Sequence, residues 1–167
     1  MIALARGRPD GPLSPLGLGI ALGVVALDQG AKWLADTTLP FGQAIDILPF
    51  LALYLTVNSG IAFSLFAGFG TLGLIAATSA ISLAVAIIWA RSREGGRLAA
   101  IGYALILGGA IGNLIDRVLR GVVVDYLLLH AGGWTLFVFN LADAALTLGP
   151  IALVLAFMQK PEAGKEG

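Results

Sequence analysis

Four long apolar stretches constrain this chain more than any other feature of its sequence. They run over about residues 16–34, 63–90, 98–119 and 136–158. A helix that crosses a bilayer needs about 20 mostly apolar residues, so each stretch is long enough to span a membrane. Only 12% of the residues are charged and 58% are hydrophobic, whereas a soluble domain carries about 25% charged residues. We therefore expect one integral membrane domain over residues 1–167.

Lysine and arginine are unevenly distributed between the two ends of these spans. Those that lie before the first span, between the second and third, or after the fourth are Arg6, Arg8, Arg91, Arg93, Arg97, Lys160 and Lys165. Only Lys32, Arg117 and Arg120 lie toward the other end. Because cytoplasmic loops are enriched in these residues, we predict that both termini are cytoplasmic and that segments 36–60 and 120–135 face outward.

The segment 41–60 differs from the spans. Pro40 and Pro49 disfavour a helix there, and β-branched and aromatic residues partly alternate with others. This pattern predicts one or two short strands. The expected fold class is an all-α membrane protein, with four transmembrane helices and a small extracytoplasmic β-rich segment between the first and second helices.

Polar side chains gather near the outer ends of the predicted spans. Ionisable groups at membrane depth are costly, so they usually mark a site or an ion path. Four separate segments bring such groups to one level of the membrane, which indicates a functional site. The group comprises Asp28, Lys32, Asn58, Asn113, Asp116, Arg117, Asp125, Asn140 and Asp143.

Several of these residues also have a purely structural interpretation. Asp28 and Lys32 are four residues apart and are expected to form an ion pair that supports the site. Asn113 and Arg117 share the same spacing, and Arg117 either reaches for the interface or holds a carboxylate or a substrate carbonyl. Asp116 is expected on a different face of its helix, only as a surface partner for Arg120.

Asp125 and Asp143 are the hardest to explain structurally. Both lie in apolar surroundings, with no basic residue within four positions. Two carboxylates close together in such a setting cannot both ionise cheaply, so one keeps a proton and the pair offers an acid and a base. Such a pair could activate water for hydrolysis. From the residues alone, a catalytic pair and a proton relay are equally good hypotheses.

Five motifs in order bear on this choice. They are Asp28–Lys32 (D-x-x-x-K), Asn58–Ser64 (N-x-G-x-A-F, with Ile61 where alanine is common), Gly108–Arg117 (G-G-A-x-G-N-x-x-D-R), Val124–Tyr126 (V-D-[FY]) and Phe139–Asp143 (F-N-x-A-D). Together they cover about residues 20–160, and the chain resembles the lipoprotein signal peptidase (signal peptidase II) family of prokaryotic membrane aspartic peptidases.

The resemblance implies a substrate and a site. The substrate would be a prolipoprotein that carries diacylglycerol on its cysteine, cut just before that cysteine at the outer face of the bacterial cytoplasmic membrane. Asp125 and Asp143 would be catalytic. The residues implied to bind substrate or to support the pair are Asp28, Lys32, Asn58, Gly109, Asn113, Arg117 and Asn140. No metal, organic cofactor or nucleic acid is implied, and we expect a monomer in contact with membrane lipid.

Two other classes of protein could also carry these polar residues. A small transporter or proton channel could use Asp28, Lys32 and Asp143 as a relay. A non-catalytic assembly subunit could use polar groups only to join helices. A channel needs polar residues at several depths, whereas here they gather at one level, and an assembly subunit has no need of two unpaired carboxylates. The enzyme is therefore favoured.

Overall fold

The computed structural model describes residues 7–60 and 70–158 of the chain. Within these residues lie four helices, α1 (Pro15–Thr38), α2 (Gly70–Arg91), α3 (Gly96–Arg120) and α4 (Leu141–Met158). All four are long and apolar enough to cross a membrane. The four predicted spans are thus confirmed as helices, although 63–69 lies outside the described residues and 136–140 is not helical.

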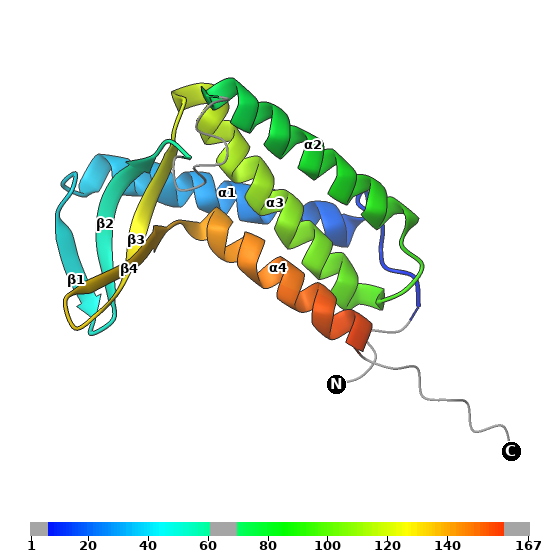
Figure 1. Ribbon diagram of the computed structural model, residues 1–167. Coiled ribbons are helices and arrows are strands. Elements are labelled where there is room, and N and C mark those ends of the chain that lie inside the picture. The colour runs from blue at the N-terminus through cyan, green and yellow to red at the C-terminus, as the bar shows by residue number, and fades with distance from the viewer. Residues whose placement is uncertain (1–6, 61–69, 159–167) are drawn as a thin grey trace, which may run out of the picture.

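The central helix of the bundle is α3, which packs against α1, α2 and α4 (Figure 1). Gly108, Gly109 and Gly112 let its neighbours approach closely. A Cβ atom at Gly109 would lie 2.5 Å from the carbonyl oxygen of Ala142 in α4, and one at Gly112 would lie 2.6 Å from Asp28 Oδ2 in α1. These close approaches leave no room for a side chain between α3 and the two helices that carry polar residues.

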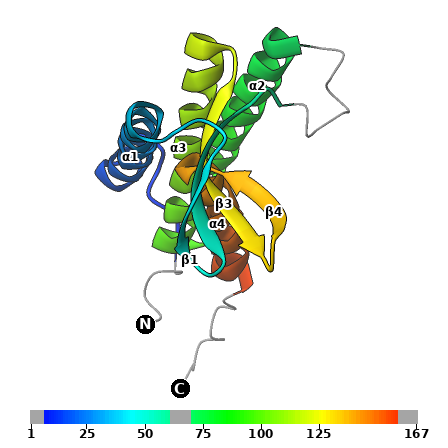
Figure 2. The ribbon, with the colours of Figure 1, turned by 90° about the vertical axis from the view of Figure 1, so that its left-hand side faces the viewer.

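A four-stranded antiparallel sheet lies at one end of the bundle (Figures 1 and 2). Its strands, in spatial order, are β1 (Ala44–Leu48), β2 (Leu51–Asn58), β3 (Val123–Ala131) and β4 (Trp134–Phe139). The C-terminal ends of α1 and α3 and the N-terminal ends of α2 and α4 lie at this same end of the molecule (Figure 1). The strands predicted within 41–60 are confirmed as β1 and β2.

The other half of the sheet corrects the expected fold class. The β-rich part is not confined to the segment between the first two helices, because β3 and β4 come from the segment between α3 and α4. The fourth helix was predicted to begin at Leu136, but residues 136–139 belong to β4 and the helix begins at Leu141. The strand is as apolar as the helix after it, so hydropathy alone cannot distinguish where the strand ends and the helix begins. Gly132 and Gly133, both with positive φ, form the tight hairpin turn.

The pairing of β2 with β3 determines which side chains meet. Asp125 pairs with Thr56 and Val123 pairs with Asn58, so Asp125 and Asn58 are diagonal neighbours on one face of the sheet. The alternate residues of β3, Val124 and Tyr126, pack with Ala35 of α1 on the other face. Since successive side chains in a strand point to opposite faces, this packing directs Asp125 away from α1.

Candidate active site

Asn140 links the two candidate catalytic carboxylates. Its side-chain Nδ2 donates a hydrogen bond to Asp125 Oδ1 at 2.6 Å. Its backbone N–H donates to Asp143 Oδ2 at 3.2 Å, while the backbone N–H of Asp143 donates to Asn140 Oδ1 at 3.0 Å. This reciprocal pair is a capping box at the N-terminus of α4. The same residue that starts the helix therefore brings Asp125 of β3 beside Asp143 of α4.

Asn113 of α3 supports the pair from a third element. Its Nδ2 donates to Asp143 Oδ1 at 2.7 Å. Its Oδ1 accepts from Lys32 Nζ at 3.0 Å and from Asn140 Nδ2 at 3.2 Å. The amide thus has its oxygen toward a cation and its nitrogen toward a carboxylate, which is the only orientation that satisfies both neighbours.

The electrostatics of Asp125 fit a group that retains a proton. The residue is only 2% exposed, and burial together with the nearby charge of Asp143 raises its pKa from 3.8 to about 6. Contacts with the side chains of Asn140 and Asn58, and the positive charge of Lys32, act in the opposite direction. Desolvation and a like charge are the two effects expected to separate a carboxylate pair into an acid and a base.

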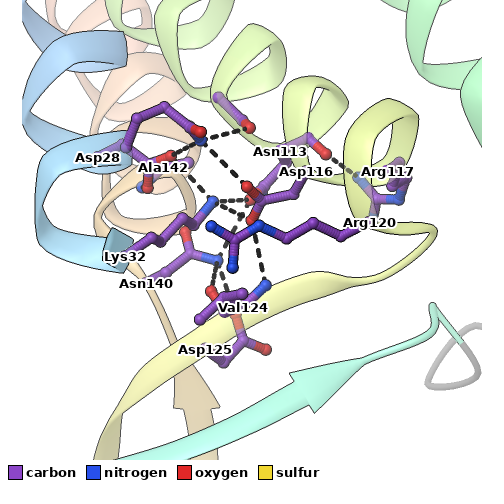
Figure 3. A network of polar contacts seen from close by, with 12 residues as sticks. Asp28, Lys32, Asn113, Asp116, Arg117, Arg120, Val124, Asp125, Asn140 and Ala142 are labelled. Atoms are coloured by element: carbon purple, nitrogen blue, oxygen red, sulfur yellow. Dashed lines mark hydrogen bonds and ion pairs between the residues drawn. The ribbon is translucent and has the colours of Figure 1, made fainter. Parts of the chain in front are cut away.

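A buried ion cluster is joined to this hydrogen-bond network through Asn113, whose side-chain oxygen accepts from Lys32 (Figure 3). The predicted ion pair is confirmed, since Lys32 Nζ lies 2.9 Å from Asp28 Oδ2. The same ammonium lies 2.9 Å from Asp116 Oδ2. The prediction that Asp116 has only a surface role is wrong, because it is 1% exposed and Arg120 pairs with Asp36 instead.

Arg117 and Asn58 lie at the edge of the network. Arg117 is half-buried, donates to the backbone oxygen of Asn113 at 3.3 Å, and stays within electrostatic range of Asp125 and Asp143. Asn58 is half-buried at the end of β2, and its Oδ1 accepts from the N–H of Gly60 at 2.8 Å. The rest of its motif, residues 61–64, lies outside the described residues.

Sequence reasoning missed one member of the network, Gln29, and assigned the wrong role to another, Asp116. Gln29 Nε2 donates to Asp28 Oδ2 and to Asp116 Oδ1, both at 3.2 Å, and to the backbone oxygen of Gly112 at 3.1 Å. Both lie inside motifs that were recognised, so the signal was present. What the sequence did not reveal is that α3 is surrounded by helices, which makes a side chain on another face of α3 point toward α1 rather than toward the surface.

The arrangement places charged and amide groups at the sheet end of four candidate spans. Such a fold and site define a class, that of a membrane enzyme with a candidate carboxylate pair. Two solved structures, each described as a bacterial membrane enzyme determined by the in meso method, have this fold. One gives a TM-score of 0.80 with 28% identity over 92% of this chain and 99% of its own. The other gives 0.79 with 29% identity over 93% and 94%.

Sequence comparison identifies the family. The model described as signal peptidase (SPase) II, Peptidase_A8, matches residues 20–159. Lipoprotein signal peptidases of Brucella ovis and Brucella canis are each 48% identical over 138 residues, which is 83% of this chain and 86% of theirs. The chain therefore belongs to the signal peptidase II family of proteases, as the five motifs predicted, and the transporter alternative is not favoured.

Proposed function

We propose that this protein removes the signal peptide from diacylglyceryl-modified prolipoproteins by cutting before the lipidated cysteine, with Asp125 and Asp143 as the catalytic pair. The observation that carries this proposal is the bridge made by Asn140, which holds both carboxylates in one hydrogen-bonded unit. A fixed pair can act as acid and base on one water molecule, whereas two independent surface carboxylates cannot.

The chemistry follows from the different surroundings of the two groups. Asp143, whose oxygens both accept N–H donors, takes a proton from the attacking water. Asp125, with its raised pKa, gives its proton to the carbonyl oxygen as the water oxygen bonds to the carbonyl carbon. When the C–N bond breaks, the proton held by Asp143 passes to the leaving nitrogen and one from the diol returns to Asp125. The products are a new carboxyl group and an amine, and the pair is restored.

Neighbouring groups are suited to hold the substrate. Arg117 and Asn58 border the pair from α3 and β2 and offer donors for backbone carbonyls of the peptide. Gly109 lets α4 approach α3 directly below Asp143. Asn113, Asp28 and Lys32 act from behind the pair, where they support it rather than contact the peptide.

The proposed location is the bacterial cytoplasmic membrane, with both termini inside and the sheet end outside. This orientation rests on the distribution of lysine and arginine. It places the scissile bond where water is available, while the acyl chains of the substrate remain in lipid. We propose that a monomer is sufficient, since Asn140 joins the two carboxylates through hydrogen bonds made within one chain.

A cleavage assay with purified protein and a lipidated prolipoprotein tests the catalytic pair. Asp125→Asn and Asp143→Asn should each reduce cleavage by at least about a thousandfold, because an amide can neither accept nor donate the required proton. Asp46→Asn is the matched control, since Asp46 is on β1, 74% exposed, and should leave the rate unchanged. Full activity in either variant of the pair would refute the proposed mechanism.

The same assay tests the substrate class. An unlipidated precursor of identical sequence should be cut far more slowly than the diacylglyceryl form, because it lacks the acyl chains that anchor the substrate in lipid. Equal rates for the two precursors would instead indicate a general signal peptidase.

A further inference from the structure

Each candidate catalytic carboxylate is preceded by a residue whose backbone N–H is held by a buried aspartate. Asp28 Oδ1 accepts from the N–H of Ala142 at 2.9 Å, one residue before Asp143. Asp116 Oδ2 accepts from the N–H of Val124 at 3.1 Å, one residue before Asp125. The backbone on both sides of the site is therefore fixed by a charge-assisted hydrogen bond, which is stronger than one between neutral groups.

The two anchoring aspartates are joined to each other. Lys32 Nζ lies 2.9 Å from the Oδ2 atom of Asp28 and of Asp116. Gln29 Nε2 donates to both carboxylates at 3.2 Å. The two aspartates are 0% and 1% exposed and Lys32 is 0% exposed, so none of the charges is compensated by water. Buried charges persist only when they are paired and hydrogen-bonded, so the four side chains act as one unit.

We propose that Asp116 and Gln29 are positioning residues, which, with Asp28 and Lys32, set the separation and orientation of Asp125 and Asp143. This inference rests on the proposed function, because it assigns a role relative to that catalytic pair. Among the described residues, neither side chain is hydrogen-bonded to the carboxylate of Asp125 or Asp143. Asp116 acts through the N–H of Val124, and Gln29 acts by holding the two anchors at a constant distance from each other.

A positioning role differs from general structural support in what it changes. Displacement of a catalytic group by about 1 Å can reduce a rate by about a hundredfold without weakening substrate binding. Structural support alone would lower the thermal stability and the folded fraction, but would leave kcat per folded molecule unchanged. The kinetics of folded, full-length enzyme therefore separate the two roles.

Two substitutions of Asp116 give the first readout. Asp116→Asn keeps an oxygen that can accept from Val124 N–H, so we expect kcat to fall by about tenfold, with KM within about twofold of the wild type. Asp116→Ala removes the acceptor, and kcat should fall by about another tenfold. Partial rescue by the conservative variant is the mark of a positioning group. Asp36→Asn is the control, since this exposed carboxylate near the end of α1 pairs with Arg120 and not with Lys32.

The pH profile gives a readout that stability cannot mimic. Lys32 from α1, Arg117 from α3 and Asp143 from α4 are the charged groups that act on Asp125 and its surroundings. In Asp116→Asn the charge of Lys32 is no longer offset by Asp116, so a proton leaves Asp125 more easily. The alkaline limb of kcat/KM should move to lower pH by about half a unit or more. An unchanged limb would overturn the proposed coupling.

Gln29→Met provides a second variant that alters no charge. It removes the three side-chain hydrogen bonds that Gln29 donates within the described part of the chain, while keeping a side chain of similar length, so it should fold even where Asp116→Ala does not. We expect a kcat about three- to tenfold lower with KM unchanged. Unchanged kcat for Gln29→Met and Asp116→Asn, with lower stability only, would overturn the proposal. Loss in Asp116→Asn as complete as in Asp125→Asn would overturn it too, by making Asp116 catalytic.

Results that refute the proposed function can be distinguished from results that refute only the positioning role. In that case the wild-type protein would not cut the lipidated precursor, or Asp125→Asn would remain fully active, whatever happened at Asp116 and Gln29.

Discussion

At the scale of single residues, Asn140 combines two roles that are usually separate. Its oxygen caps α4 through the N–H of Asp143, which leaves its nitrogen free to donate to Asp125. The same nitrogen lies 3.3 Å from the backbone oxygen of Val124. An amide has a donor end and an acceptor end. When the oxygen of Asn140 caps the helix, its nitrogen is therefore directed toward Asp125 in β3. The same side chain therefore both starts α4 and aligns the candidate pair.

The burial of Asp125 predicts a cost in stability that depends on pH. Folding raises its pKa from 3.8 to about 6, so between these pH values the unfolded chain releases a proton that the folded protein keeps. The contribution of Asp125 to stability therefore falls as the pH rises through this window, and the loss is complete above pH 6. Asparagine has no charge to bury. Asp125→Asn should thus be more stable than the wild type above about pH 6, by about 1 to 2 kcal/mol.

Thermal unfolding in detergent at about pH 4 and about pH 8 measures this difference. The two proteins should have similar midpoints at the lower pH, and the variant should unfold at a higher temperature at the upper pH. A difference that is the same at both values would show that ionisation of Asp125 is not its cause.

At the scale of helices and strands, the sequence predicted what depends on hydropathy and missed what depends on packing. Helices were found because a span needs a long apolar run. The strand β4 was missed because Trp134–Phe139 is continuous with the apolar run of α4. Asp116 was misread because its environment is set by α1, a helix distant in sequence. The candidate pair itself could be proposed from local context, whereas the bridge through Asn140 needed the structure.

The contact between α3 and α4 predicts a sensitive glycine. A Cβ at Gly109 would lie 2.5 Å from the carbonyl oxygen of Ala142 and 3.0 Å from Leu146 Cγ, so Gly109→Ala forces α4 away from α3 next to Asp143. We expect a loss of about 1 to 3 kcal/mol in stability and a lower kcat. Gly30→Ala is the control, because a Cβ at Gly30 has open space around it. Thermal unfolding and the cleavage assay measure both variants, and equal behaviour would contradict the packing argument.

At the scale of the whole molecule, the two ends of the helix bundle differ both in their charged residues and in their fold. Arg8, Arg91, Arg93 and Arg97 lie at the end of the bundle away from the sheet, where α1 begins and α2 meets α3 (Figure 1). The buried network, in contrast, lies at the sheet end. The arginines at the end away from the sheet are exposed, as suits a cytoplasmic surface. The charges of the buried network instead form ion pairs with one another. The polarity of the molecule is therefore present in the fold as well as in the sequence.

This polarity predicts the orientation in the membrane, and the chain offers a clean test because it contains no cysteine. Gln43→Cys places a thiol at an exposed position beside β1, and Glu94→Cys places one at an exposed position in the loop between α2 and α3. If the sheet faces outward, a membrane-impermeant maleimide added to intact bacterial spheroplasts should label Gln43→Cys at once and Glu94→Cys only after lysis. The wild-type protein reports background labelling. The reverse pattern would invert the proposed topology and put the candidate pair on the cytoplasmic side, where a prolipoprotein exported across the membrane could not reach it.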